Sequence, residues 1–113
     1  MTASAFSLSA LYPIVRFKLL EGEPVVGGLH GDTRHMFCGY CLSWLYIQPD
    51  GMDDFVNVRS TLLDAPSSEP PFIETVTSEA LPWARTGAQH AFANFPPPDR
   101  FPALVAEFSG RDR

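Results

Sequence analysis

The sequence predicts a mainly β protein with one short helix near its C-terminus. Apolar and polar residues alternate with a period of two through much of the first two thirds of the chain, which is typical of half-buried strands. The pattern changes to a helical period only near residue 99. Eleven prolines, most of them beyond residue 65, interrupt the region before the helix and predict ordered loops there.

The strand pattern recurs in segments that are bounded by turn residues. In 14–20, for example, apolar side chains alternate with Arg16 and Lys18, so that one face is apolar and the other is charged. Glycine, proline and acidic residues predict turns at 21–24 and 48–51 and a loop at 27–32. The expected strands cover residues 6–10, 14–20, 24–27, 42–47, 55–62 and 72–77.

The helix is predicted over residues 99–109. Its apolar side chains recur at the spacing i, i+3, i+4 and i+7, which places them on one face of a helix. Asp99 is the expected N-cap, Pro102 falls in the first turn, and Gly110 follows the end. The apolar face comprises Phe101, Leu104, Val105 and Phe108.

The length bounds the number of domains. A chain of 113 residues with 45% apolar content can bury one small hydrophobic core and is short for two. We therefore expect a single domain over residues 1–113. It comprises a strand-rich core at 5–78, a loop-rich closing segment at 79–98 and the short helix at 99–109.

Charge and hydropathy exclude two classes of partner. The formal net charge of −5 opposes attraction to phosphate backbones, so nucleic acid is not an expected partner. No apolar run approaches the roughly 20 residues that cross a bilayer, and the first residues lack the basic region of a secretory signal. We expect a cytoplasmic protein that does not enter a membrane.

Both cysteines of the chain, Cys38 and Cys41, lie in the stretch HMFCGYCLSW at 35–44. A Cys-x-x-Cys pair can be a redox dithiol, a disulfide, or half of a four-ligand zinc site. A redox dithiol normally opens a helix, whereas the residues after Cys41 have the composition of a strand that ends at Pro49. A reducing cytosol disfavours the disulfide. These arguments favour a metal site or two buried free thiols.

A closed zinc site needs two further ligands. The pair lies between two strand-like stretches, and Gly39 tolerates the bend that would let both thiolates converge on one metal. The upstream side chains of His30, Asp32 and His35 could complete the site, although a loop histidine is more often solvated.

The stretch 5–96 resembles the family of glutathione-dependent formaldehyde-activating enzymes, which shares its domain with centromere protein V. The segment TRHMFCGYC at 33–41 matches the family's Arg-x-x-Phe-Cys-x-x-Cys element, and FVNVRSTLLD at 55–64 resembles a strand that ends in Thr-Leu-Asp. Further matches, in the same order as in the family, are FSLSALYP at 6–13, EGEPVV at 21–26, and LPW at 81–83 with HAF at 90–92.

The resemblance implies small twisted sheets of the Mss4-like type, two zinc ions and a reaction. In the family, the pair that matches Cys38 and Cys41 joins an N-terminal Cys-x-Cys in a structural site. A second cysteine cluster holds a catalytic zinc, which activates the thiol of glutathione for addition to formaldehyde. The product is S-hydroxymethylglutathione, and the activity is classed as a carbon-sulfur lyase. The resemblance thus implies zinc as cofactor and glutathione as co-substrate.

The chain departs from this pattern because it has only two cysteines. We expect a shortened member whose structural zinc site is reduced to Cys38 and Cys41 and which is inactive as a lyase. Either the gene start was assigned too late, or the chain is a paralogue that has lost the site. A missing segment would leave a sheet edge or an apolar face uncovered, so we expect a homodimer. The alternative function is a non-enzymatic β domain that forms a zinc-bridged or metal-free homodimer.

No catalytic residue can be assigned from the sequence, and other candidates have simple structural interpretations. Trp83 and His90 could line a pocket for a small thiol or aldehyde, but they fit a core or rim aromatic and a surface loop residue better. Arg16 and Lys18 could meet the carboxylates of glutathione, although exposed strand charges are commoner. The acidic residues are expected in solvated turns or as a turn cap: Asp50, Asp53, Asp54 and Asp64.

Overall fold

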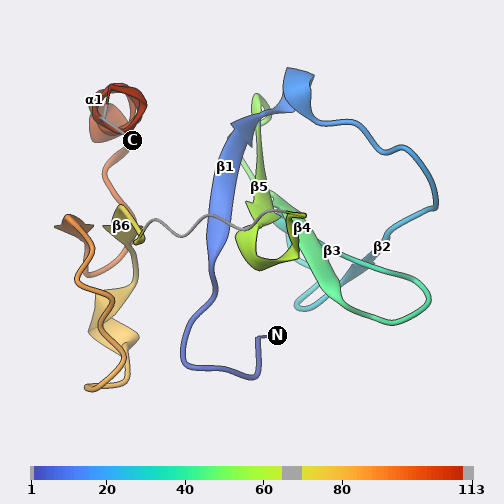
Figure 1. Ribbon diagram of the computed structural model, residues 1–113, viewed down its shortest axis with the longest axis horizontal. Helices are drawn as coiled ribbons and strands as arrows, with labels where there is room; N and C mark the ends of the chain where they lie inside the picture. Colours follow the sequence, from blue (N-terminus) through green and yellow to red (C-terminus); the bar gives the residue numbers. More distant parts are fainter. Residues whose placement is uncertain (1, 65–69, 111–113) are drawn as a thin grey trace. The chain divides into compact units, whose positions relative to one another are not determined.

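A computed structural model describes residues 2–64 and 70–110 of the chain. These residues form two compact units, unit 1 (residues 2–64) and unit 2 (residues 70–110). Unit 1 contains a five-stranded sheet, and unit 2 contains a two-stranded sheet and the α-helix of the described residues (Figure 1). The predicted mainly β fold with one short C-terminal helix is confirmed. The Mss4-like type and the single domain stay predictions.

The sheet of unit 1 has the order β1-β5-β4-β3-β2, and all neighbouring strands are antiparallel. Strands β2 to β5 follow one another as a meander, and β1 lies on the far side of β5 (Figure 1). The two edges of the sheet are therefore β1 and β2. The strands are β1 (Ser9–Pro13), β2 (Val25–Gly27), β3 (Arg34–Phe37), β4 (Trp44–Gln48) and β5 (Phe55–Arg59).

The core of unit 1 lies on one face of this sheet. Met36, Tyr46 and Val56, from β3, β4 and β5, form its buried cluster, and Val56 is 0% exposed. Met36 lies opposite Tyr46 in the register, and the ring of Phe17 lies 4.8 Å from that of Tyr46. Alternation in three neighbouring strands thus brings three apolar side chains together.

A β-bulge interrupts the pairing of β3 with β4. The register passes from Met36 opposite Tyr46 to Phe37 opposite Trp44, so that Leu45 has no partner of its own. In a regular strand Trp44 and Tyr46 would face the same side, but one extra residue reverses that relation. Trp44 accordingly contacts Phe37 and His35, on the face opposite the core.

The expected strand at 14–20 is wrong, and the expected strand at 6–10 is displaced. Strand β1 begins at Ser9 and continues to Pro13, because a proline is tolerated at an edge strand. The N–H of Ile14 then donates to the carbonyl of Asp54 at 2.7 Å, and the N–H of Phe17 donates to the carbonyl of Ile14 at 3.0 Å. The second bond closes the 3-10 helix η1 (Ile14–Arg16) where the alternation predicted a strand.

Strands β2, β4 and β5 agree with the prediction in position but not in length, whereas β3 is not among the predicted strands. Strand β2 falls within 24–27, and β4 begins two residues later than the expected 42–47. The expected strand at 55–62 ends at Arg59, because the N–H of Leu63 donates to the carbonyl of Ser60 and closes the 3-10 helix η2 (Ser60–Leu62).

Unit 2 is built around two short parallel strands, β6 (Ile73–Glu74) and β7 (His90–Ala91). The expected strand at 72–77 is shorter than predicted, since the 3-10 helix η3 (Thr77–Glu79) follows it. Strand β7 lies inside the segment 79–98, where we expected loops. Two-residue strands carry no readable alternation, which explains why the pattern missed β7.

The helix α1 (Phe101–Ser109) confirms the predicted helix within two residues. Pro102 lies in its first turn and Gly110 is its C-cap, as expected. Asp99 is not the N-cap, because the N–H of Arg100 donates to the carbonyl of Pro97 at 2.9 Å within the 3-10 helix η4 (Pro98–Arg100). Within residues 2–64 and 70–110 no helix is long and apolar enough to cross a membrane.

Replacing Val56 by alanine should destabilise unit 1 by about 2 kcal/mol, because the lost methyl groups leave a cavity in a fully buried site. Val15→Ala is the matched control, since Val15 is 89% exposed and its truncation should change stability by less than about 0.5 kcal/mol. Urea unfolding followed by circular dichroism measures both. Equal effects of the two substitutions would contradict the position of this core.

Candidate functional site

Cys38 and Cys41 lie in the turn that joins β3 to β4. The N–H of Cys38 donates to the carbonyl of Ser43 at 2.9 Å, and the N–H of Leu42 donates to the carbonyl of Cys38 at 2.9 Å. Both cysteines are free thiols, Cys38 half-buried and Cys41 exposed. The segment 38–43, which we call the cysteine turn, is thus closed by backbone hydrogen bonds and presents its thiols at the end of a hairpin.

Two hydrogen bonds in the cysteine turn involve the sulfur atoms. The N–H of Cys41 donates to Sγ of Cys38 at 3.5 Å, and the thiol of Cys41 donates to the hydroxyl oxygen of Ser43 at 3.2 Å, a bond that the Ser43 hydroxyl donates instead once the thiol has lost its proton. Donors of this kind stabilise a thiolate more than a thiol. The Ser43 hydroxyl is the largest cause that lowers the pKa of Cys41, and the Ser43 backbone and the Cys38 side chain act in the same direction.

The bend of the cysteine turn occurs at Leu42 and not at Gly39. Leu42 has a φ of 63°, in the left-handed region, whereas Gly39 has no positive φ. This conformation costs a residue other than glycine about 1–2 kcal/mol. It is retained because it allows the Leu42 N–H to reach the Cys38 carbonyl and so closes the turn.

The structure does not bring the expected additional ligands to the thiols. Among residues 2–64 and 70–110, no group of three or more histidine, cysteine, aspartate or glutamate side chains could hold a metal ion. His35 is on β3, with its ring 5.5 Å from that of Trp44. Because Cys41 is exposed, the alternative of two buried free thiols does not describe the pair.

A second cluster lies next to the cysteine turn, on the sheet face opposite the core, and the sequence patterns did not predict it. The guanidinium of Arg59 lies over the indole of Trp44, with Cζ 4.2 Å from the ring centroid, and the ring of His35 packs against the same indole. We call these three side chains the Trp44 stack. Burial lowers the pKa of Arg59. Detecting the cluster requires the register of three strands and the bulge, which composition and spacing do not reveal.

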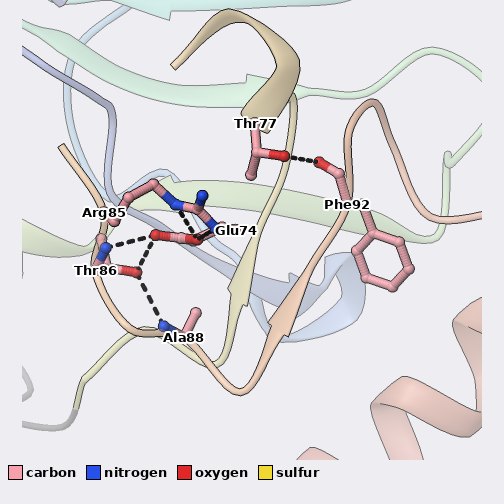
Figure 2. Close-up of polar contacts among 6 residues, drawn as sticks. All are labelled: Glu74, Thr77, Arg85, Thr86, Ala88 and Phe92. Atoms are coloured by element: carbon pink, nitrogen blue, oxygen red, sulfur yellow. Dashed lines mark hydrogen bonds and ion pairs between the residues drawn. The ribbon is translucent and has the colours of Figure 1, made fainter. Parts of the chain in front are cut away.

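In unit 2, Glu74 forms the densest polar network (Figure 2). Its carboxylate accepts from Nε and a terminal nitrogen of Arg85, at 3.2 and 3.0 Å, and from the backbone N–H and hydroxyl of Thr86. The Thr86 hydroxyl in turn accepts from the N–H of Ala88. The hydrogen bonds from Thr86, and then that from Arg85, lower the pKa of Glu74 to about 2. A carboxylate so fully engaged fixes a loop and is not free to move protons.

The two aromatic candidates of the closing segment have unequal roles. Trp83 is 74% exposed, so of the two interpretations that we favoured, a core or a rim aromatic, the core aromatic is wrong. His90 is on β7, with Nε2 2.9 Å from the Glu107 carboxylate and its ring 5.0 Å from that of Phe72. This residue is half-buried and ties β7 to α1, so the surface-loop interpretation is wrong as well.

The remaining candidates lie in turns and loops. The backbone N–H of Asp50 donates to the hydroxyl of Thr33 at 3.2 Å, and the carbonyl of Asp54 accepts from Ile14, so backbone groups of this turn hold unit 1 together. All of the following side chains are exposed: Arg16, Lys18, Asp50, Asp53, Asp54 and Asp64. Arg16 and Lys18 do not form the expected charged strand face, because η1 and an irregular segment replace that strand.

No protein-family model, curated protein or solved structure matches the chain. The resemblance to formaldehyde-activating enzymes therefore rests on the order and content of the sequence motifs alone, and what it implies belongs with the proposals below.

Replacing Ser43 by alanine should raise the pKa of Cys41, because the largest stabilising contact of its thiolate is removed. The thiolate fraction at neutral pH falls, so alkylation of Cys41 by iodoacetamide should slow. The pH dependence of the alkylation rate, measured at Cys41 by peptide mass spectrometry, gives the pKa directly. Ser7→Ala, at another exposed serine of unit 1, is the control and should leave the rate unchanged. An identical pKa in S43A and the unmodified protein would contradict the assignment.

Glu74→Gln should destabilise unit 2 at neutral pH, by an amount that shrinks in acid. The pKa of Glu74 is lowered from 4.5 to about 2 in the folded state, so its stabilisation is complete above about pH 4.5 and is lost as the pH falls toward 2. Thermal unfolding between pH 7 and pH 2 should show the two proteins converging in that range. Glu79→Gln, at an exposed carboxylate of unit 2, serves as control. A constant difference across the whole range would refute the carboxylate's role.

Proposed function

We propose that the chain is a zinc-binding β domain of the formaldehyde-activating type, in which Cys38 and Cys41 supply half of a structural metal site. The observation that carries the proposal is the hydrogen bond from the Cys41 N–H to Cys38 Sγ within a closed hairpin turn. Backbone donors that point at sulfur orient thiolates and offset their charge, which is the function of the groups surrounding a metal ligand. The thiol-supporting contacts and the Arg-x-x-Phe-Cys-x-x-Cys motif support the same interpretation.

Zinc is the metal that suits this donor set. Thiolates are soft ligands, and a tetrahedral zinc site commonly takes two of them from one Cys-x-x-Cys turn. The lowered pKa of Cys41 favours metal binding at neutral pH, because a thiol must lose its proton to become a ligand. A redox dithiol is less well supported, since the cysteine turn leads into β4 and not into a helix.

We further propose that a second copy of the chain supplies the other two ligands, which makes the zinc-bridged homodimer the preferred assembly. Unit 1 leaves large apolar side chains exposed, among them Leu19 and Leu20, and exposed apolar surface is typical of association surfaces. An apolar groove of about 410 Å³ lies beside the core, with Phe17, Leu45 and Leu62 in its lining. A two-fold axis near the cysteine turn would bring four thiolates together. A metal-free homodimer is the alternative assembly.

The proposal covers metal binding and association but no catalysis. The lyase reaction of the family uses a second cysteine cluster, whereas both cysteines of this sequence lie in one turn. We therefore assign no catalytic residue, and no binding site for glutathione or for another thiol or aldehyde substrate. Two free thiols are typical of a reducing compartment, so the proposal places the protein in the cytoplasm.

Titration of the reduced protein with Co²⁺ should produce the thiolate-to-metal absorption bands that zinc then displaces. Zinc should saturate at about half an ion per chain, because four thiolates from two copies complete one tetrahedral site. Sedimentation equilibrium with and without zinc should show dimers that chelation weakens.

Cys38→Ser and Cys41→Ser should each abolish these bands. Tyr40→Ala is the matched control, because Tyr40 is 96% exposed in the same turn and is not a ligand. Saturation at about one ion per monomer would contradict the shared site. Bands that persist in both cysteine variants, or no bands at all, would overturn metal binding by the turn.

A further inference from the structure

Arg59 is a half-buried cation without an anionic partner among the described residues. Its guanidinium lies over the indole of Trp44, with Cζ 4.2 Å from the ring centroid. The ion pairs of the described residues are Arg85 with Glu74 and His90 with Glu107, both in unit 2. Within this half-buried side chain Nε is buried and has no acceptor, which is unusual because buried polar groups are normally paired.

Each member of the Trp44 stack also carries a buried nitrogen without a hydrogen-bond partner. These atoms are Nδ1 of His35, Nε1 of Trp44 and Nε of Arg59. The indole and guanidinium nitrogens are donors only, and Nδ1 of His35 is a donor in one of its neutral tautomers. Unsatisfied buried polar atoms are rare in folded proteins, and three of them on one stack, two of which can only donate, indicate that an acceptor belongs there.

We propose that the Trp44 stack is a binding site for the carboxylate of a small organic acid. The indole covers the guanidinium at Cζ, and a carboxylate matches a planar guanidinium with two parallel hydrogen bonds. Trp44 and His35 offer further donors beside it once their side chains adjust. The anion supplies the acceptors that the chain lacks at this place.

The surroundings favour a monocarboxylate over a polyphosphate. The stack carries one permanent positive charge in a protein of net charge −5, which disfavours highly charged anions. The ring of Phe37 lies nearly parallel to that of Trp44, with centroids 6.3 Å apart and 22° between the planes. These half-buried rings form an apolar wall beside the cation, against which the hydrocarbon part of an acid can pack.

The test uses NMR spectroscopy of the ¹⁵N-labelled chain with sodium benzoate as probe. Trp83→Phe leaves Trp44 as the sole tryptophan, so that a single indole N–H signal reports on the stack. At constant ionic strength kept with sodium chloride, benzoate should shift the indole N–H of Trp44 and the Nε–H of Arg59 in a saturable manner. Acetate should act more weakly, because it lacks the ring.

Arg59→Lys keeps the charge but loses the planar fork, and Arg59→Gln loses both. Both variants should weaken benzoate binding, Arg59→Gln by at least about tenfold, because a charge-assisted hydrogen-bonded pair is lost. Arg16→Gln removes an exposed arginine elsewhere in unit 1 and should bind as the unmodified protein does. If Arg59→Gln unfolds, as judged by circular dichroism, the Lys variant alone tests whether benzoate binding needs the planar guanidinium or only a positive charge.

Three outcomes would overturn the proposal: equal shifts with chloride alone, tighter binding of phosphate than of benzoate, or unchanged binding in Arg59→Lys. A peptide with a free C-terminal carboxylate and its amidated form complete the series. Saturable binding of the free-acid peptide without any binding of benzoate would identify a protein terminus in place of a small acid and so overturn it as well. The measurements are made without metal, so their result is independent of the zinc proposal.

Discussion

The β-bulge between β3 and β4 is the constraint on which both candidate sites depend. By skipping Leu45 in the register, it leaves Tyr46 in the core and turns Trp44 to the opposite face. The same shift makes Phe37 and Trp44 the last pair before the cysteine turn. Without the extra residue, the indole would lie on the core face, and the guanidinium of Arg59 would lose its contact with it.

How far the sequence predicts this structure depends on whether the determining contact is local. The alternation and the helical period located most elements of the sheet and the helix, because they reflect burial of one face. The alternation at 14–20 failed, since the chain forms η1 there, and the N–H of its first residue, Ile14, bonds to Asp54, forty residues away in the sequence. The Cys-x-x-Cys spacing located the turn, but not its left-handed residue, Leu42. The Trp44 stack could not be predicted from the sequence, because its members come from three strands and one of them is positioned by a bulge.

Unit 2 illustrates a different balance of forces. Its strands are too short to hold each other, and its fully buried apolar side chains are few. Hydrogen bonds to two carboxylates also stabilise this unit. Glu74 fixes the loop at Thr86, and Glu107 joins α1 to Gln89 and His90. Charge-assisted hydrogen bonds of this kind are directional, so they specify a loop path that a small apolar core could not. Neither glutamate stands out in the sequence, because its partners lie 11 to 18 residues away.

The cysteine turn and the Trp44 stack share one piece of backbone, and this has a consequence for how they would act together. Ser43 supports the Cys41 sulfur, accepts from the Cys38 N–H and immediately precedes Trp44. A metal ion held by the two thiolates would fix Ser43 as an outer-shell donor and thereby restrict the indole that follows it. An acid bound to Arg59 would restrict the same indole from the other side. Each ligand would then bind to a surface that the other had already ordered, and by linkage any such coupling must be reciprocal.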